Sequence, residues 1–139
     1  MCGAVSFRAV DMADTFSTCH CKMCQRWAGS AFSGASVKSA DLKVTGGDNI
    51  GTVQSSDFAE RTFCKECGSS LWYRLTAGKY VGATSVAIGL LDDTDGLTLN
   101  HEYFSDYKNS TNELPEDRKQ TTAAEVEGII ADFLGGGQA

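Results

Sequence analysis

The chain has 139 residues, a length typical of one domain, and 42% of its residues are hydrophobic and 22% charged, as in ordinary globular proteins. Its formal net charge of -6 argues against a general binder of nucleic acid or of anionic membranes, because both functions need positive charge. No apolar run approaches the ~20 residues of a membrane span, and the start, MCGAVSFRAV, lacks the charged beginning and long apolar core of a signal peptide.

Short strands separated by turn signals are predicted for most of the chain. Alternating, β-branched and aromatic residues predict strands over residues 3–9, 31–38, 41–47, 49–56, 60–64, 69–75, 79–91 and 96–104. Glycine and aspartate between them, at 46–47, 78 and 92–96, are typical of turns. Many short strands at close spacing predict a mainly β domain.

The C-terminal segment has a helical pattern instead. Thr122 can cap a helix, Glu125 completes a capping box three residues later, and Gly135 supplies a stop. The apolar residues at helical spacing are Val126, Ile129, Ile130, Phe133 and Leu134. We therefore expect a β domain over 1–108, a linker over 109–121, and an amphipathic helix over 122–134 that packs on the domain.

The cysteines carry the strongest chemical signal. They are Cys2, Cys19, Cys21, Cys24, Cys64 and Cys67. Without an export signal we expect a cytoplasmic protein, where cysteines are metal ligands or reactive thiols more often than disulfides. A C-x-x-C turn presents two sulfurs to one ion, and zinc favours tetrahedral sites with thiolate ligands. The clustering therefore predicts zinc.

The spacing leaves two divisions of these ligands open. In one, favoured by spacing alone, Cys21 and Cys24 join the 64–67 pair in a single closed four-thiolate site. In the other, Cys19, Cys21 and Cys24 form a first cluster, and Cys2, Cys64 and Cys67 form a second cluster. A site with three protein ligands keeps one coordination position open, as catalytic zinc does and structural zinc does not.

Five motifs resemble one known family. CGAVSF, CHCKMCQRWAGSAF, FCKECGSSLWYR, VAIGLLDD and HEYF, within residues 2–108, occur in the order and spacing of the glutathione-dependent formaldehyde-activating enzymes, which include proteins like centromere protein V. The resemblance implies small stacked antiparallel sheets around two zinc sites, with a catalytic ion in the first cluster and a structural ion in the second. The family's N-terminal motif is C-x-C-G where this sequence has Met1-Cys2-Gly3, so the second cluster lacks a fourth cysteine.

The resemblance also implies a reaction. It is that of a carbon–sulfur lyase, in which formaldehyde joins the thiol of glutathione to give S-(hydroxymethyl)glutathione. A free thiol of pKa about 8.5 is mostly protonated at neutral pH, and a zinc ion with three thiolates suits thiol activation better than carbonyl activation. The alternative is a non-catalytic zinc module that binds a protein partner or another small thiol. A homodimer is left open.

Several side chains near the cysteines are candidates for substrate contacts. Arg26 is our first choice to bind a glutathione carboxylate, because its fork is bidentate, and Trp27 and Phe32 could wall the pocket. Surface and core roles are the alternatives for all three. Arg61, Lys65 and Arg74 flank the later cysteine pair. His20 is considered as a metal ligand and His101 as a proton shuttle, and structural roles are favoured for both.

Overall fold

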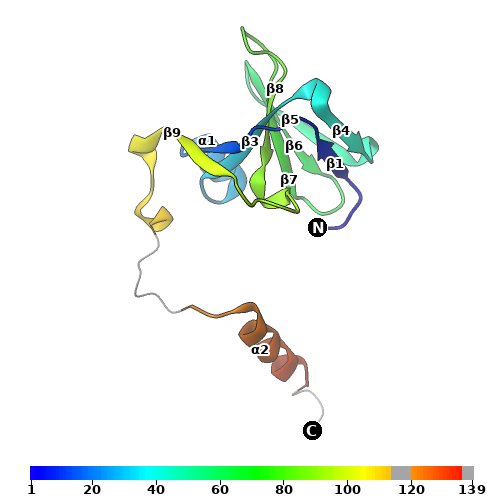
Figure 1. The fold of residues 1–139 in the computed structure, drawn as a ribbon, viewed down its shortest axis with the longest axis vertical. Coiled ribbons are helices and arrows are strands. Elements are labelled where there is room, and N and C mark those ends of the chain that lie inside the picture. Colours follow the sequence, from blue (N-terminus) through cyan, green and yellow to red (C-terminus); the bar gives the residue numbers. More distant parts are fainter. Residues whose placement is uncertain (114–119, 136–139) are drawn as a thin grey trace.

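The computed structural model describes residues 1–113 and 120–135, the last five of these by their backbone alone. Its strands are β1 (Ser6–Ala9), β2 (Thr15–Cys19), β3 (Phe32–Lys38), β4 (Leu42–Thr45), β5 (Ile50–Ser56), β6 (Ala59–Cys64), β7 (Ser70–Leu75), β8 (Ala83–Ala87) and β9 (Thr98–Tyr103). Its α-helices are α1 (Lys22–Ala28) and α2 (Ala123–Gly135). The expected mainly β fold with a C-terminal helix is confirmed (Figure 1).

The strands form two sheets. The larger has the order β5-β6-β7-β8-β3-β2-β9, and the smaller pairs β1 with β4. All described pairs are antiparallel except β2–β9, which is parallel. Strand β2 and helix α1 were not predicted from the sequence, because both are short and lie directly beside the cysteines that dominate the pattern there.

The two sheets pack on each other through a small apolar core. Its buried members are Val37, Leu42, Leu71, Trp72 and Val86. Phe7 of β1 meets the Trp72 ring edge to face, with 6.1 Å between centroids, so the smaller sheet packs on the centre of the larger one. This contact fixes where the N-terminal segment lies relative to β7.

Helix α2 begins as predicted. The backbone N–H of Thr122 donates to Glu125 Oε2 at 2.6 Å, and the N–H of Glu125 donates back to Thr122 Oγ1 at 3.4 Å, which confirms the capping box. Figure 1 draws the helix apart from the β domain, and Val126, Ile129 and Ile130 are 40%, 61% and 49% exposed.

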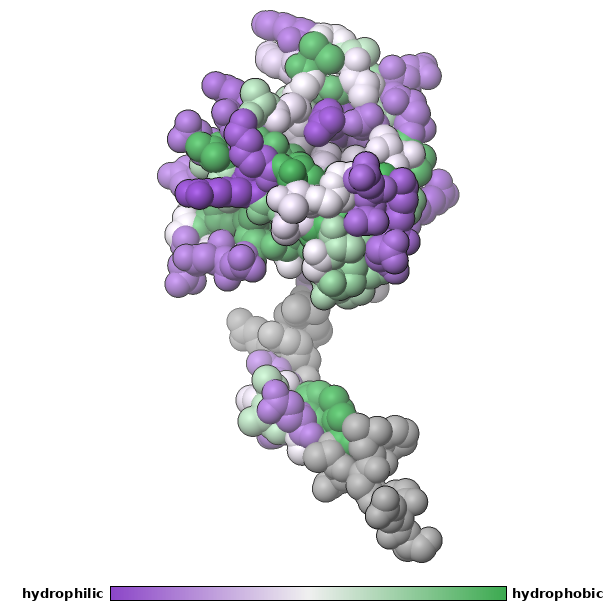
Figure 2. Space-filling view, turned by 90° about the vertical axis from the view of Figure 1, so that its right-hand side faces the viewer, coloured by the Kyte–Doolittle hydropathy of each residue, from purple (hydrophilic) through white to green (hydrophobic). Residues whose placement is uncertain are grey.

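The space-filling view shows a hydrophobic area on α2 that the β domain does not cover (Figure 2). Packing of this helix on the domain is not seen among the described residues and stays a prediction. The side chains of Phe133 and Leu134, and residues 114–119 of the expected linker, lie outside the described part. Neither described helix has both the length and the hydropathy needed to cross a membrane.

Candidate metal centres

The first cluster is built by the end of β2 and the start of α1. Cys19 is the last residue of β2, where it pairs with Phe32 of β3. Cys21 is the N-cap of α1, and its sulfur accepts the backbone N–H of Cys24 at 3.3 Å. Gly29 ends the helix with a φ of 75°, a left-handed conformation that glycine adopts without strain. The strand end and the helix start together aim three thiols at one point.

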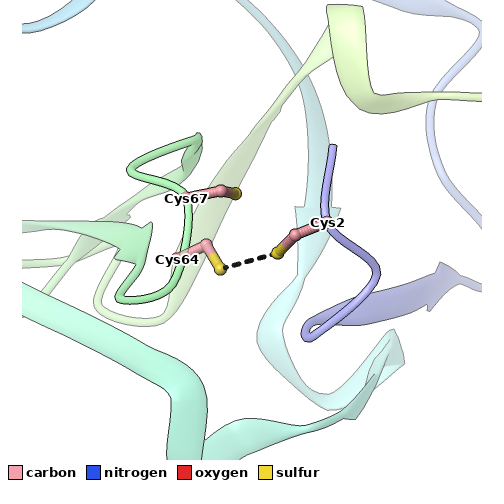
Figure 3. Close-up of side chains that lie close together, drawn as sticks. All are labelled: Cys2, Cys64 and Cys67. Atoms are coloured by element: carbon pink, nitrogen blue, oxygen red, sulfur yellow. Dashed lines mark hydrogen bonds between the residues drawn. The ribbon is translucent and has the colours of Figure 1, made fainter.

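The second cluster joins the turn between β6 and β7 to the N-terminal segment. Cys64 ends β6, and its carbonyl accepts the N–H of Gly68 at 2.8 Å, which closes the turn before β7. Cys2 Sγ lies 3.6 Å from Cys64 Sγ, and Figure 3 shows Cys67 turned toward the same space. Asn49 Nδ2 donates to Ala4 O at 3.3 Å and helps to hold the segment that carries Cys2.

The structure decides how the cysteines divide. The sulfurs of Cys19, Cys21 and Cys24 lie within 4.8 Å of one another, and those of the second cluster do the same. The single four-thiolate site that spacing alone favoured is therefore wrong. The division follows from the tertiary structure. Pairing of β1 with β4 brings Cys2 to the 64–67 turn, while the start of α1 holds Cys21 and Cys24 beside Cys19.

Both clusters fit a metal ion by the chemistry of their donors. Three converging sulfurs form a soft donor set, which suits zinc among the common divalent ions. Burial raises the pKa of Cys24 to about 12 and also raises that of Cys19. Burial acts upward on Cys21 as well, but hydrogen bonds from Cys24 outweigh it and lower the pKa of Cys21. A metal bound by the first cluster would therefore displace protons that Cys19 and Cys24 otherwise hold firmly.

The second cluster has a different acidity. Hydrogen bonds from the side chain and the backbone of Ser69 lower the pKa of Cys67 to about 6. The Ser69 hydroxyl lies 3.3 Å from Cys67 Sγ. The lowered pKa favours the thiolate form of this sulfur, which is the form that binds a metal cation.

Arg61 is a neighbour of the first cluster that the sequence analysis misplaced. It was expected beside the later cysteine pair, but its Nη2 donates to Cys24 Sγ at 3.2 Å. The side chain is buried, with 5% of the residue exposed, and its guanidinium lies over the ring of Tyr73, 5.1 Å from the centroid. Burial raises the pKa of this tyrosine. Position 61 is far from the first cluster in sequence, so spacing could not reveal the contact.

His20 has a structural role. It is 2% exposed, its Nε2 donates to Glu102 Oε1 at 2.9 Å, and its Nδ1 accepts from Asn112 Nδ2 at 3.4 Å. Both ring nitrogens are thus occupied, and neither described cysteine group includes a histidine. His20 ties the loop of the first cluster to β9 and to the segment after it.

Known proteins identify the family. The family model described as "Glutathione-dependent formaldehyde-activating enzyme" matches residues 1–107, which include both clusters. The chain belongs to this family. A relative from Schizosaccharomyces pombe, named an uncharacterized lyase, is 38% identical over 79 residues, and the match spans 57% of this chain and 57% of that protein.

The fold of this formaldehyde-activating family member is also found in a solved structure. A crystal structure of a Rhodobacter sphaeroides protein matches with a TM-score of 0.54 and 24% identity, over 71% of this chain and 94% of that one. At this identity the match supports the fold alone.

The residues expected to contact a substrate have different surroundings in this family member. Arg26 is exposed in the last turn of α1. Trp27 is half-buried, donates from Nε1 to Ser70 Oγ at 2.7 Å, and meets Phe63 edge to face at 6.2 Å. Phe32 is half-buried beside Cys19 in the register of β3 and β2. Trp27 therefore packs α1 onto β6 and β7.

His101 is exposed on β9, with its ring 4.2 Å from the ring of Tyr103. It pairs with Ser17 in the parallel register of β9 and β2, two residues before Cys19. His101 therefore lies within the strand beside the one that ends in Cys19, and its role as a proton shuttle stays a prediction.

Proposed function

We propose that the chain is a zinc-dependent carbon–sulfur lyase that joins formaldehyde to the thiol of glutathione. The observation that carries the proposal is the convergence of Cys19, Cys21 and Cys24 in a group of their own. The second cluster also has three cysteines, and the two are told apart by the family motif, which implies the catalytic ion in the first cluster. Family membership gives the reaction class, and the name of the S. pombe relative agrees with a lyase. The second cluster would hold a structural zinc ion.

The reaction needs a thiolate sulfur beside an aldehyde carbon. The S–H bond of glutathione breaks, a C–S bond forms, the C=O π bond opens, and the proton ends on the new hydroxyl oxygen. Cys19, Cys21 and Cys24 would hold the zinc ion, which would supply the positive charge that keeps a bound small thiol as a thiolate near neutral pH.

The protein's own residues fix the geometry of the site. The capping position of Cys21 and the strand pairing of Cys19 set the directions of two sulfurs. His20 lies between these two cysteines, and its hydrogen bonds to Glu102 and Asn112 hold the backbone there in one conformation. Preorganised ligands of this kind lose little conformational freedom when substrate binds.

The carboxylates of glutathione need positive partners. Arg26 is exposed on the helix that also carries Cys24, and no described carboxylate lies within ion-pair distance of it. An exposed guanidinium can bind a carboxylate through two parallel hydrogen bonds. We propose Arg26 as the carboxylate contact, with Phe32 as the apolar wall beside Cys19 and Trp27 as the support of the helix.

The test compares the rate of S-(hydroxymethyl)glutathione formation with and without the zinc-loaded protein, because the uncatalysed reaction is the baseline. Exchange NMR on glutathione and formaldehyde measures both rates in one sample. We expect acceleration by wild type, loss of it in Cys21→Ala, and retention in Arg8→Ala, a variant of an exposed arginine on the other sheet. A wild-type rate equal to the baseline, with glutathione still bound, would favour the non-catalytic thiol-binding module.

A further inference from the structure

We propose that Arg61 is the counter-charge of the first cluster and sets how tightly that cluster binds a metal ion. The inference rests on the metal site of the proposed function and adds a residue to it. Arg61 acts through Cys24 and touches no substrate, so it is a positioning residue.

Arg61 is a buried cation beside the first cluster. Arg61 is 5% exposed, and the described residues place no carboxylate within ion-pair distance of it. Its neighbours at hydrogen-bond distance are Ser55 Oγ, Met23 Sδ at 3.4 Å and Cys24 Sγ at 3.2 Å. A buried cation is costly unless an anion lies nearby, and Cys24 is the only one of these three groups that can become an anion.

Arg74 on the adjacent strand β7 has different surroundings from Arg61. Arg74 is paired with Glu60 at 3.4 Å, and 32% of its side chain is exposed. It has the partner and the solvent that arginines in proteins usually have. Among the residues that the structure describes, Arg61 has no carboxylate partner, and it is almost fully buried. A negatively charged cluster beside it would compensate its charge.

Strand β6 and helix α1 together place the Arg61 guanidinium beside Cys24. Arg61 and Phe63 are two residues apart on β6 and so point to the same face of the sheet. Helix α1 covers this face, with Met23 and Cys24 at Arg61 and Trp27 at Phe63. The contact between Trp27 and Phe63 fixes α1 on the sheet, and α1 in turn holds Cys24 against Arg61.

Arg61 also changes the net charge of the first cluster when a metal ion is bound. A divalent ion with three thiolates carries one negative charge, and Arg61 brings the total to zero. Protons leave the thiols when the metal binds, and a cation beside Cys24 stabilises the thiolate form that results. An incoming thiolate then makes the site singly rather than doubly negative. Arg61 therefore favours the metal and also a thiol as its fourth ligand.

The test uses zinc loss from the full-length protein at fixed pH under increasing chelator. The zinc ion that is missing from Cys21→Ala is the one bound by the first cluster. In Arg61→Met, which keeps the side-chain length and removes the charge, we expect the affinity for this zinc ion to be at least tenfold weaker than in wild type. The other zinc should stay as in wild type. Arg61→Lys should keep affinity within about threefold of wild type, and Arg74→Met should behave as wild type.

A spectroscopic readout separates charge from shape. With Co²⁺ in place of zinc, removing the cation should move the sulfur-to-cobalt charge-transfer band to lower energy, while the ligand-field bands stay tetrahedral. Wild-type affinity and an unmoved band in Arg61→Met would overturn the proposal. If Arg61→Met does not fold, Arg61→Lys decides: a zinc affinity within threefold of wild type supports the counter-charge, and any larger loss overturns it.

These outcomes are independent of catalysis. Zinc that depends on Arg61 in a protein without lyase activity would refute the proposed reaction and keep this inference. Lyase activity in wild type together with an unchanged zinc affinity in Arg61→Met would support the proposed reaction and refute this inference.

Discussion

Arg26 and Arg61 show how two arginines near the same helix differ in chemistry. Arg26 is exposed in the last turn of α1 and has no described ion pair, whereas Arg61 is buried against Cys24. An exposed guanidinium is available to a dissolved anion, and a buried one can serve only the atoms that already surround it. The two residues therefore need different experiments.

Arg26→Ala should weaken glutathione binding by about tenfold, which corresponds to about 1.4 kcal/mol and to the loss of one charge-assisted contact. Isothermal titration of the zinc-loaded protein measures it. Arg8→Ala is the matched control, since it removes an equally charged and exposed side chain from the other sheet. Equal affinities in wild type and Arg26→Ala would remove Arg26 from the proposed site.

His20→Ala should leave the zinc content unchanged and reduce the free energy of unfolding by about 2–4 kcal/mol. The variant creates a buried cavity and removes the partners of Glu102 and Asn112. Metal analysis and urea unfolding give the two numbers. Loss of one zinc ion per chain with little change in stability would instead make His20 a ligand.

At the scale of elements, a turn glycine controls the second cluster from a distance. Gly46 has a φ of 77°, and a Cβ placed on it would lie 1.9 Å from the carbonyl oxygen of Ala4. The loop after β4 therefore lies directly against the segment that leads from Cys2 into β1. A side chain at position 46 must displace that segment.

Gly46→Ala should therefore weaken zinc at the second cluster although it changes no ligand. We expect the free energy of unfolding to fall by at least about 1–2 kcal/mol, the cost of a left-handed alanine, and the second zinc to be lost at lower chelator concentration. Gly47→Ala is the matched control, because nothing lies within 4 Å of a Cβ there. Identical behaviour of the two variants would contradict this account of the N-terminal segment.

The capping box gives α2 a dependence on pH. Hydrogen bonds from the side chain and then the backbone of Thr122 lower the pKa of Glu125. The helix-stabilising contribution is therefore present above the ordinary carboxyl pKa and is lost as the pH falls through the lowered one. NMR shifts of the Thr122 amide should follow that titration, and Glu125→Gln should abolish it while Glu127→Gln should not. A shift that persists in Glu125→Gln would exclude the capping carboxylate as its source.

Much of the β architecture could be predicted from the sequence, for identifiable reasons. Alternation and turn residues located β3 to β7 to within a residue or two, and the Thr122–Glu125 pair marked the start of α2. β2 was missed because TFSTC is brief and runs into the cysteines. Its parallel pairing with β9 joins residues about 80 positions apart, which local patterns do not encode.

At the scale of the whole molecule, the division of the cysteines is a tertiary property. Cysteine spacing alone favoured one site shared by the two C-x-x-C pairs, because each pair offers two sulfurs. Spacing does not encode the pairing of β1 with β4, which brings Cys2 to the 64–67 turn. The family resemblance supplied the division that the structure has. The role of Arg61 could be inferred from neither, because a strand register and a helix packing together create its contact.

The zinc content of Cys19→Ala tests the central claim most directly, because Cys19 is a ligand if the first cluster holds its own ion and is idle in a site shared by the two C-x-x-C pairs. Native mass spectrometry counts the ions in the folded chain. The two-centre account predicts two zinc ions in wild type and one in Cys19→Ala. An unchanged zinc count in the variant would contradict it.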